Sequence, residues 1–167
     1  MRVAVFVDGS NFFHMQQKSL PSFIDPKKLL NYVSSNIGEI QDAYYYTGHN
    51  TPPLDNQEAY FDALSKMGYS LIRKPIKTIY DQETGENRQK ANLDIEIVLD
   101  MFNTIDNYDL AVLVSGDGDF DRPLQLLKAR RKKFKIMSTD KFLAKELRQI
   151  AGMHFINFED IFDIIKK

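Results

Sequence analysis

Two short acidic sequences, more than a hundred positions apart, contain the residues of this chain that could do chemistry. The first reads V-F-V-D-G-S-N at 5–11, and the second reads V-S-G-D-G-D-F at 114–120. Each begins as a short apolar strand and ends in acidic and small residues. Because the carboxyl ends of parallel strands share one edge of a sheet, we expect Asp8, Asp117 and Asp119 to meet there.

A cluster of carboxylates is unfavourable unless its charge is neutralised. At about 4 Å and an effective dielectric constant near 20, one like-charge pair costs on the order of 4 kcal/mol. Such a cluster persists when it is protonated, solvated or bound to a cation. The cation is the interpretation with chemical consequences, because a bound Mg²⁺ or Mn²⁺ supports phosphate chemistry. For either acidic sequence alone, the alternative is a turn whose acid caps a helix.

A fourth acid, Asp94, lies in the sequence N-L-D-I-E-I-V-L-D-M-F at 92–102. Apolar residues recur there at i, i+4 and i+8, which predicts a helix. Asp94 is near the helix start, where a negative charge also favours the helix dipole, and it adjoins the apolar face. We therefore expect it to point toward the sheet edge. Asp100 lies about 600° further round the helix and Glu96 also faces away, so both are expected to be surface or structural acids.

Composition restricts the classes of protein to which the chain can belong. The 167 residues predict one domain over 1–167. Lys and Arg total 22 against 23 Asp and Glu, so RNA would have to be held by a local patch or through metal ions. The absence of cysteine excludes disulfides and cysteine-bound zinc. No stretch approaches the roughly 18 apolar residues of a membrane span, and we expect a cytoplasmic protein that does not contact a membrane.

Short apolar runs alternate with helical patterns, which predicts an α/β fold with a mainly parallel sheet. The expected strands are 3–7, 42–47, 70–73, 110–114, 134–137 and 154–156. The expected helices are 11–18, 26–37, 55–67, 92–102, 123–131, 141–150 and 159–166. Residues 77–90 are polar and rich in turn formers, which indicates a β-hairpin arm or a mobile loop.

Three motifs, taken in order, resemble the NYN domain family, the LabA-like branch of the PIN-like nuclease superfamily. They are V-F-V-D-G-S-N-F at 5–12, K-A-N-L-D at 90–94 with the following I-V-L-D-M, and L-V-S-G-D-G-D-F at 113–120. The resemblance covers nearly the whole chain. It implies a three-layer α/β/α sandwich, PIN-like and Rossmann-like, and a ribonuclease site that depends on Mg²⁺ or Mn²⁺. RNA is the implied partner, and a homodimer stays open because PIN-like domains commonly pair.

The resemblance also assigns roles to individual residues. Asp8 and Asp117 would be the principal metal ligands and catalytic residues, completed by Asp94 and Asp119, partly through water. Asn11 would orient a water or a phosphate, and Lys90 would contact the scissile phosphate as a point charge.

Three further residues are predicted, from their position in the chain, to belong with Asn11 and Lys90 to the substrate-binding residues. Ser115, between the strand and the second pair of acids, is expected to donate a hydrogen bond behind the ligands. Arg73 and Lys74 follow a predicted strand and so belong to the same sheet edge, where we expect them to contact RNA.

Other functions fit the sequence less well. A non-catalytic domain that binds RNA or a protein partner and keeps the acidic site remains open. Haloacid dehalogenase-like phosphatases require D-x-D-x-T, and the chain reads D-G-S-N-F at 8–12. A MIDAS-type adhesion site requires D-x-S-x-S, and Phe12 occupies the last position. The glycine pattern of a P-loop or dinucleotide site is missing.

Overall fold

The computed structural model describes the backbone of residues 1–167 and every side chain except those of residues 88–90. The strands are β1 (Arg2–Asp8), β2 (Glu39–His49), β3 (Ser70–Pro75), β4 (Lys77–Tyr80), β5 (Asn87–Lys90), β6 (Leu110–Val114), β7 (Lys133–Ser138) and β8 (Phe155–Asn157). The α-helices are α1 (Gly9–Ser19), α2 (Pro26–Asn36), α3 (Asp55–Met67), α4 (Asp94–Asn103), α5 (Asp121–Ala129), α6 (Lys145–Ala151) and α7 (Phe158–Ile165). Within this described chain, every helix is too short or too polar to cross a membrane.

The main sheet is parallel throughout its described length. Its strand order is β3-β2-β1-β6-β7-β8. The central pair is β1 and β6, with Val7 opposite Val114, so both strands end at the same edge. This parallel sheet confirms the α/β fold that the alternating patterns predict.

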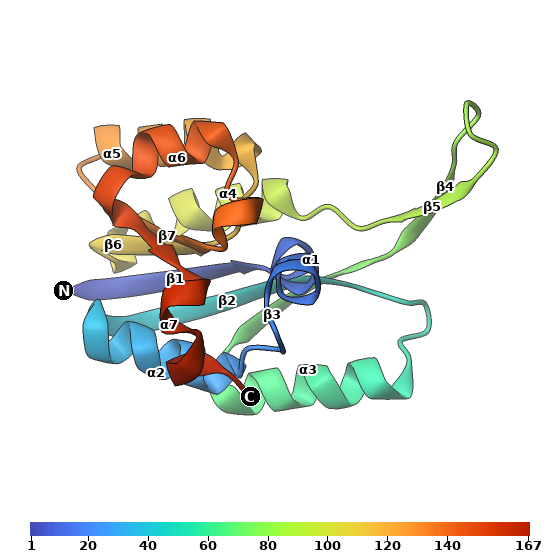
Figure 1. Ribbon diagram of the computed structural model, residues 1–167, viewed down its shortest axis with the longest axis horizontal. Coiled ribbons are helices and arrows are strands. Elements are labelled where there is room, and N and C mark those ends of the chain that lie inside the picture. The colour runs from blue at the N-terminus through green and yellow to red at the C-terminus, as the bar shows by residue number, and fades with distance from the viewer.

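Helices cover both faces of the sheet, which makes three layers (Figure 1). Val3, Val5 and Val7 of β1 pack in one core with residues of α1, α2, α3 and α7. Ala4 and Phe6, which point the other way, pack in a second core with residues of α4, α5 and α6. Because successive strand residues face opposite sides, a strand buried on both faces reads as one continuous apolar run. The first strand was predicted from that signal.

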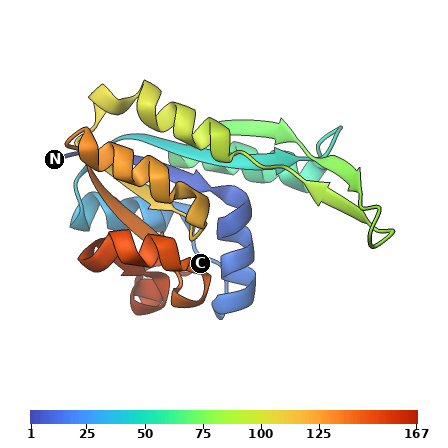
Figure 2. The same ribbon diagram turned by 90° about the horizontal axis from the view of Figure 1, so that it is seen from above.

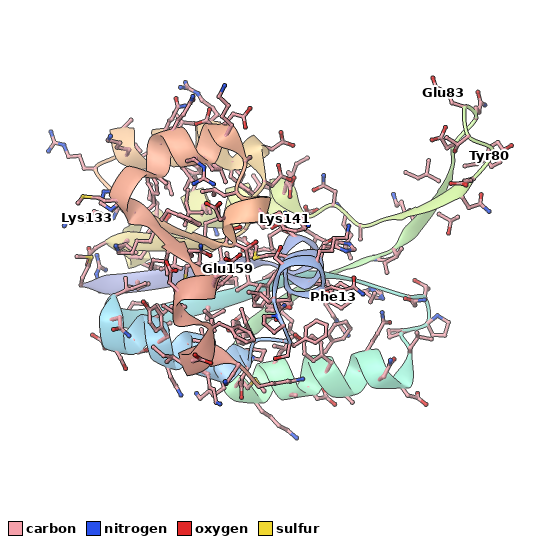
Figure 3. The ribbon with its side chains drawn as sticks, viewed as in Figure 1. Phe13, Tyr80, Glu83, Lys133, Lys141 and Glu159 are labelled. Carbon is pink, nitrogen blue, oxygen red and sulfur yellow. The ribbon has the colours of Figure 1, made fainter. Side chains whose placement is uncertain are left out.

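A two-stranded hairpin leaves the body of the molecule at the edge where the strands end (Figures 1 and 2). Strands β4 and β5 pair antiparallel, from Lys77 opposite Lys90 to Tyr80 opposite Asn87. All four residues of β4 are exposed, and the labels of Tyr80 and Glu83 in Figure 3 mark the far end of this arm. Of the two structures expected for residues 77–90, the hairpin arm is the one observed.

The helix expected over residues 141–150 is wrong in its first turn. Residues Asp140–Phe142 form a 3₁₀ turn, and α6 begins only at Lys145. The cause is a contact with the second acidic sequence, because the backbone N–H of Ala144 donates to the carbonyl oxygen of Gly116 at 2.9 Å. This hydrogen bond to Gly116 holds residues 143–144 in an extended conformation, so α6 starts only after them.

Phe13 differs from its aromatic neighbours in the two acidic sequences. Phe12 and Phe120 are buried, whereas Phe13 is 48% exposed. Phe12 and Met15 of α1 face the sheet. A rotation of about 100° per residue then turns Phe13 away from the sheet.

Gly9 makes the sharp change from β1 to α1 sterically feasible, and this yields a prediction. A Cβ at Gly9 would overlap the carbonyl oxygen of Tyr46 and lie 2.9 Å from the ring of Tyr45. We expect Gly9→Ala to lower the free energy of unfolding by about 1–3 kcal/mol through overpacking, as measured by urea denaturation. Ser10 is the exposed neighbour of Gly9, and Ser10→Ala should change the free energy of unfolding by less than about 0.5 kcal/mol. Equal urea midpoints for Gly9→Ala and the wild type would contradict this account of the turn.

Candidate metal centre

Three segments bring carboxylates together at the edge where the central strands end. Asp8 is the last residue of β1, Asp94 the first of α4, and Asp117 lies just beyond β6. One carboxylate oxygen from each lies within 4.8 Å of the other two. Oxygens at this spacing can bind one ion together, and carboxylate oxygens are the ligands that Mg²⁺ and Mn²⁺ prefer.

Hydrogen bonds from Ser115 and Asn11 hold Asp8 and the loop after β6 in place. The Ser115 hydroxyl donates to Asp8 Oδ2 at 2.9 Å and accepts from the backbone N–H of Asp117 at 3.2 Å. The Asn11 amide oxygen accepts from the N–H of Gly116 at 3.0 Å, and the Asn11 N–H donates to Asp8 Oδ1 at 3.4 Å. The ends of β1 and β6 are therefore fixed to each other by side chains as well as by the sheet.

The burial of Ser115 limits what this side chain can do. It is fully buried, so it lies beneath the carboxylates, where it orients Asp8. This placement matches the supporting donor that we expected. It leaves no exposed surface on Ser115 for direct contact with a substrate, although we had grouped it with the substrate-binding residues.

Asp119 lies beside the group of three carboxylates and is not part of it. It is exposed, and its backbone N–H donates to Asp117 Oδ1 at 2.9 Å. Asp117 thus caps the short turn Gly118–Phe120 with one oxygen. The charge of Asp119 nevertheless reaches the site, because it raises the pKa of Asp94.

Burial and mutual repulsion oppose ionisation of these acids. Burial raises the pKa of Asp8, against the hydrogen bonds from Ser115 and Asn11 that lower it. The pKa of Asp94 is raised to about 6, first by burial and then by the charges of Asp8, Asp117 and Asp119. A cation at this position would relieve both effects, so the electrostatics fit a divalent ion.

The predicted cationic residues are engaged in ion pairs. Arg73 pairs with Glu58 at 3.0 Å and lies over the ring of Phe61, and Lys74 pairs with Glu96 at 2.6 Å. An RNA phosphate would have to compete with these carboxylates. The side chain of Lys90 lies outside the described residues.

Asp100 and Glu96 occupy the structural positions that helix geometry predicts. The hydroxyl of Tyr46 donates to Asp100 Oδ2 at 2.9 Å, which ties α4 to β2. Glu96 holds Lys74. Neither acid belongs to the group of three carboxylates found among the described residues.

Three residues that support the site, Gly116, Glu146 and Asn92, were not assigned these contacts from the sequence. A Cβ at Gly116 would overlap the carbonyl oxygen of Phe142, so glycine is required where the loop meets residues 140–144. The carboxylate of Glu146, on α6, occupies the space beside Gly118. Asn92 accepts a hydrogen bond from the N–H of Asp94 at 2.8 Å and so caps the start of α4. Only Asn92 had a local signal, because asparagine is a common helix cap.

Comparisons with known proteins agree with this architecture. Residues 2–159 match the NYN domain family. The chain is 44% identical over 168 residues to the low amplitude and bright protein LabA of Synechococcus elongatus, covering 99% of this chain and 88% of that protein. A crystal structure of a Vibrio parahaemolyticus protein of unknown function matches with a TM-score of 0.80 at 24% identity, over 95% of this chain and 93% of that one. The latter similarity supports the fold alone.

The raised pKa of Asp94 predicts how the stability of the metal-free protein depends on pH. Between pH 3.8, the ordinary pKa of an aspartate, and pH about 6, the folded protein binds more protons at this residue than the unfolded chain does. Stability in EDTA should therefore fall as pH rises through this window, and Asp94→Asn should flatten the decline. Thermal melts across this pH range measure both effects. If wild type and Asp94→Asn show the same pH dependence, the proposed environment of Asp94 is wrong.

Proposed function

The chain belongs to the NYN domain family, and from this premise we propose that it is a metal-dependent ribonuclease that hydrolyses RNA phosphodiester bonds. The observation that carries the proposal is the convergence of Asp8, Asp94 and Asp117, whose oxygens lie within 4.8 Å of one another. The family is part of the PIN-like nuclease superfamily, and an acidic cluster at this edge suits its chemistry.

In this proposal, the three carboxylates hold Mg²⁺ or Mn²⁺, and Asp119 contributes through water. When bound, the ion supplies an activated water and stabilises charge on the leaving oxygen. Below a pH of about 6, where Asp94 with its raised pKa is largely protonated, this residue would release its proton when the ion binds. Proton release of this kind makes metal affinity increase with pH up to about the pKa.

The other residues of the proposed site position the metal ligands or the RNA. Ser115 keeps Asp8 aimed at the ion, and Asn11 fixes the loop that carries Asp117. Ligands held in this way bind an ion with less reorganisation than free side chains would. Lys90 is proposed to meet the scissile phosphate. Arg73 and Lys74 are proposed to meet the RNA backbone further along, in exchange for their present carboxylate partners.

Substitution of single carboxylates tests the proposal. We expect Asp8→Asn and Asp117→Asn each to reduce cleavage of a labelled single-stranded RNA in Mn²⁺ by more than about 100-fold, because both residues are direct ligands. Asp119→Asn should lose less, since Asp119 lies outside the group of three. EDTA should abolish cleavage by the wild type.

Asp106→Asn is the matched control, because Asp106 precedes β6 at the opposite edge of the sheet. Circular dichroism should show every variant folded. Undiminished metal-dependent cleavage by folded Asp8→Asn or Asp117→Asn would refute the assigned ligands. RNA binding without cleavage in either Mg²⁺ or Mn²⁺ would instead identify a non-catalytic binding domain.

A further inference from the structure

A partly open cavity of about 710 Å³ lies between α1 and α3, next to the metal centre. We call it the aromatic groove and define it by Phe13 and Phe23 on one side, Tyr60 and Phe61 on the other, and Thr47 at its base. Its volume is within the range of about 300–1,000 Å³ that is usual for ligand sites. Figure 3 shows labelled Phe13 on the side of α1 that faces α3.

Three of the aromatic residues of this groove are open to solvent. Phe13, Phe23 and Tyr60 are all exposed, and the rings of Phe13 and Phe23 are stacked with centroids 5.8 Å apart. The hydroxyl of Tyr60 lies 3.2 Å from that of Tyr45, which anchors Tyr60 to β2. Several large apolar side chains gathered in one cavity indicate a binding surface.

The charge in the groove differs from the charge of the metal centre. None of the described residues that line the groove has an acidic side chain, whereas His14 and Lys167 have basic side chains and Asn56 has an amide. A groove with aromatic walls and no carboxylate side chain does not fit a metal ion. It fits an uncharged planar group attached to a negatively charged chain.

Two segments of chain lead from the groove to the metal centre. Gly9 and Ser10 line the groove and directly follow Asp8, and Ala91 lines it three residues before Asp94. A ligand that fills the groove would therefore lie near the carboxylates.

We propose that the aromatic groove binds the bases of single-stranded RNA adjacent to the scissile phosphate, with Phe13 and Tyr60 as stacking surfaces. This inference rests on the proposed ribonuclease function, because it supplies the substrate of the same site. Unpaired bases can stack on exposed aromatic rings, whereas bases within a duplex are already stacked and paired. The groove therefore selects single strands.

Binding measurements on a protein that cannot cut its ligand test the groove directly. In an Asp117→Asn background, fluorescence anisotropy would follow a single-stranded oligoadenylate of about 12 nucleotides. An abasic probe of the same length carries the same phosphates without bases. We expect Phe13→Leu to weaken oligoadenylate binding about 5- to 150-fold and to leave the abasic probe unaffected.

Two matched variants separate stacking from general effects. Phe13→Tyr keeps an aromatic ring and should retain binding. Leu126→Ala, which truncates an exposed apolar side chain of α5 on the opposite face of the sheet, should also retain it. The proposal is overturned if Phe13→Leu binds oligoadenylate like its parent, if it loses both probes equally, or if the parent binds neither probe. A change in self-association alone would mark the groove as a contact between copies and would also overturn it.

The outcomes distinguish this inference from the proposed function. If Phe13→Leu weakens oligoadenylate binding but the wild type cleaves no RNA, the inference about the groove is supported and the proposed nuclease activity is refuted. If the wild type cleaves RNA and Phe13→Leu has the same KM, the inference about the groove is refuted and the proposed nuclease activity is supported.

Discussion

Repulsion among the carboxylates of Asp8, Asp94 and Asp117 is the constraint on which the site depends. Left free, these side chains would turn apart into water, where their charges are screened. The fold prevents this by burying the strand before Asp8, packing α4 against the same sheet, and bonding Asp8 to Ser115. Two apolar cores therefore hold together a charge arrangement that is unfavourable by itself, which is common at functional sites.

Much of this arrangement could be predicted from the sequence, because its signals are local. A continuous apolar run that ends in Asp8 identifies a buried strand and its edge, and the run that ends before Ser115 does the same. Helical spacing places Asp94 near a helix start and turns Asp100 away, and the structure shows Asp100 bonded to Tyr46. Periodicity and strand polarity are enough to bring the three acids to one edge.

The features that the sequence did not reveal depend on contacts between distant segments. The loop at Gly116 meets residues 140–144, which changes the start of α6, and no local pattern encodes that contact. The ion pairs of Arg73 and Lys74 are of the same kind, because a positive residue at a strand end gives no sign of its partner. The exposure of Phe13 is likewise hidden in the sequence, because an aromatic residue beside a buried one is assigned to the core until the rotation of the helix is known.

Strand β4 of the hairpin contributes no residue to either core, and each of its four residues is exposed. Two strands alone are marginally stable in water, so the arm adds little to the free energy of folding. Selection for foldability therefore constrains its length and tip weakly, and insertions there are tolerated far more readily than in the sheet. The arm can therefore change in length or sequence, and with it whatever the arm touches, without disturbing the sheet edge that holds Asp8, Asp94 and Asp117.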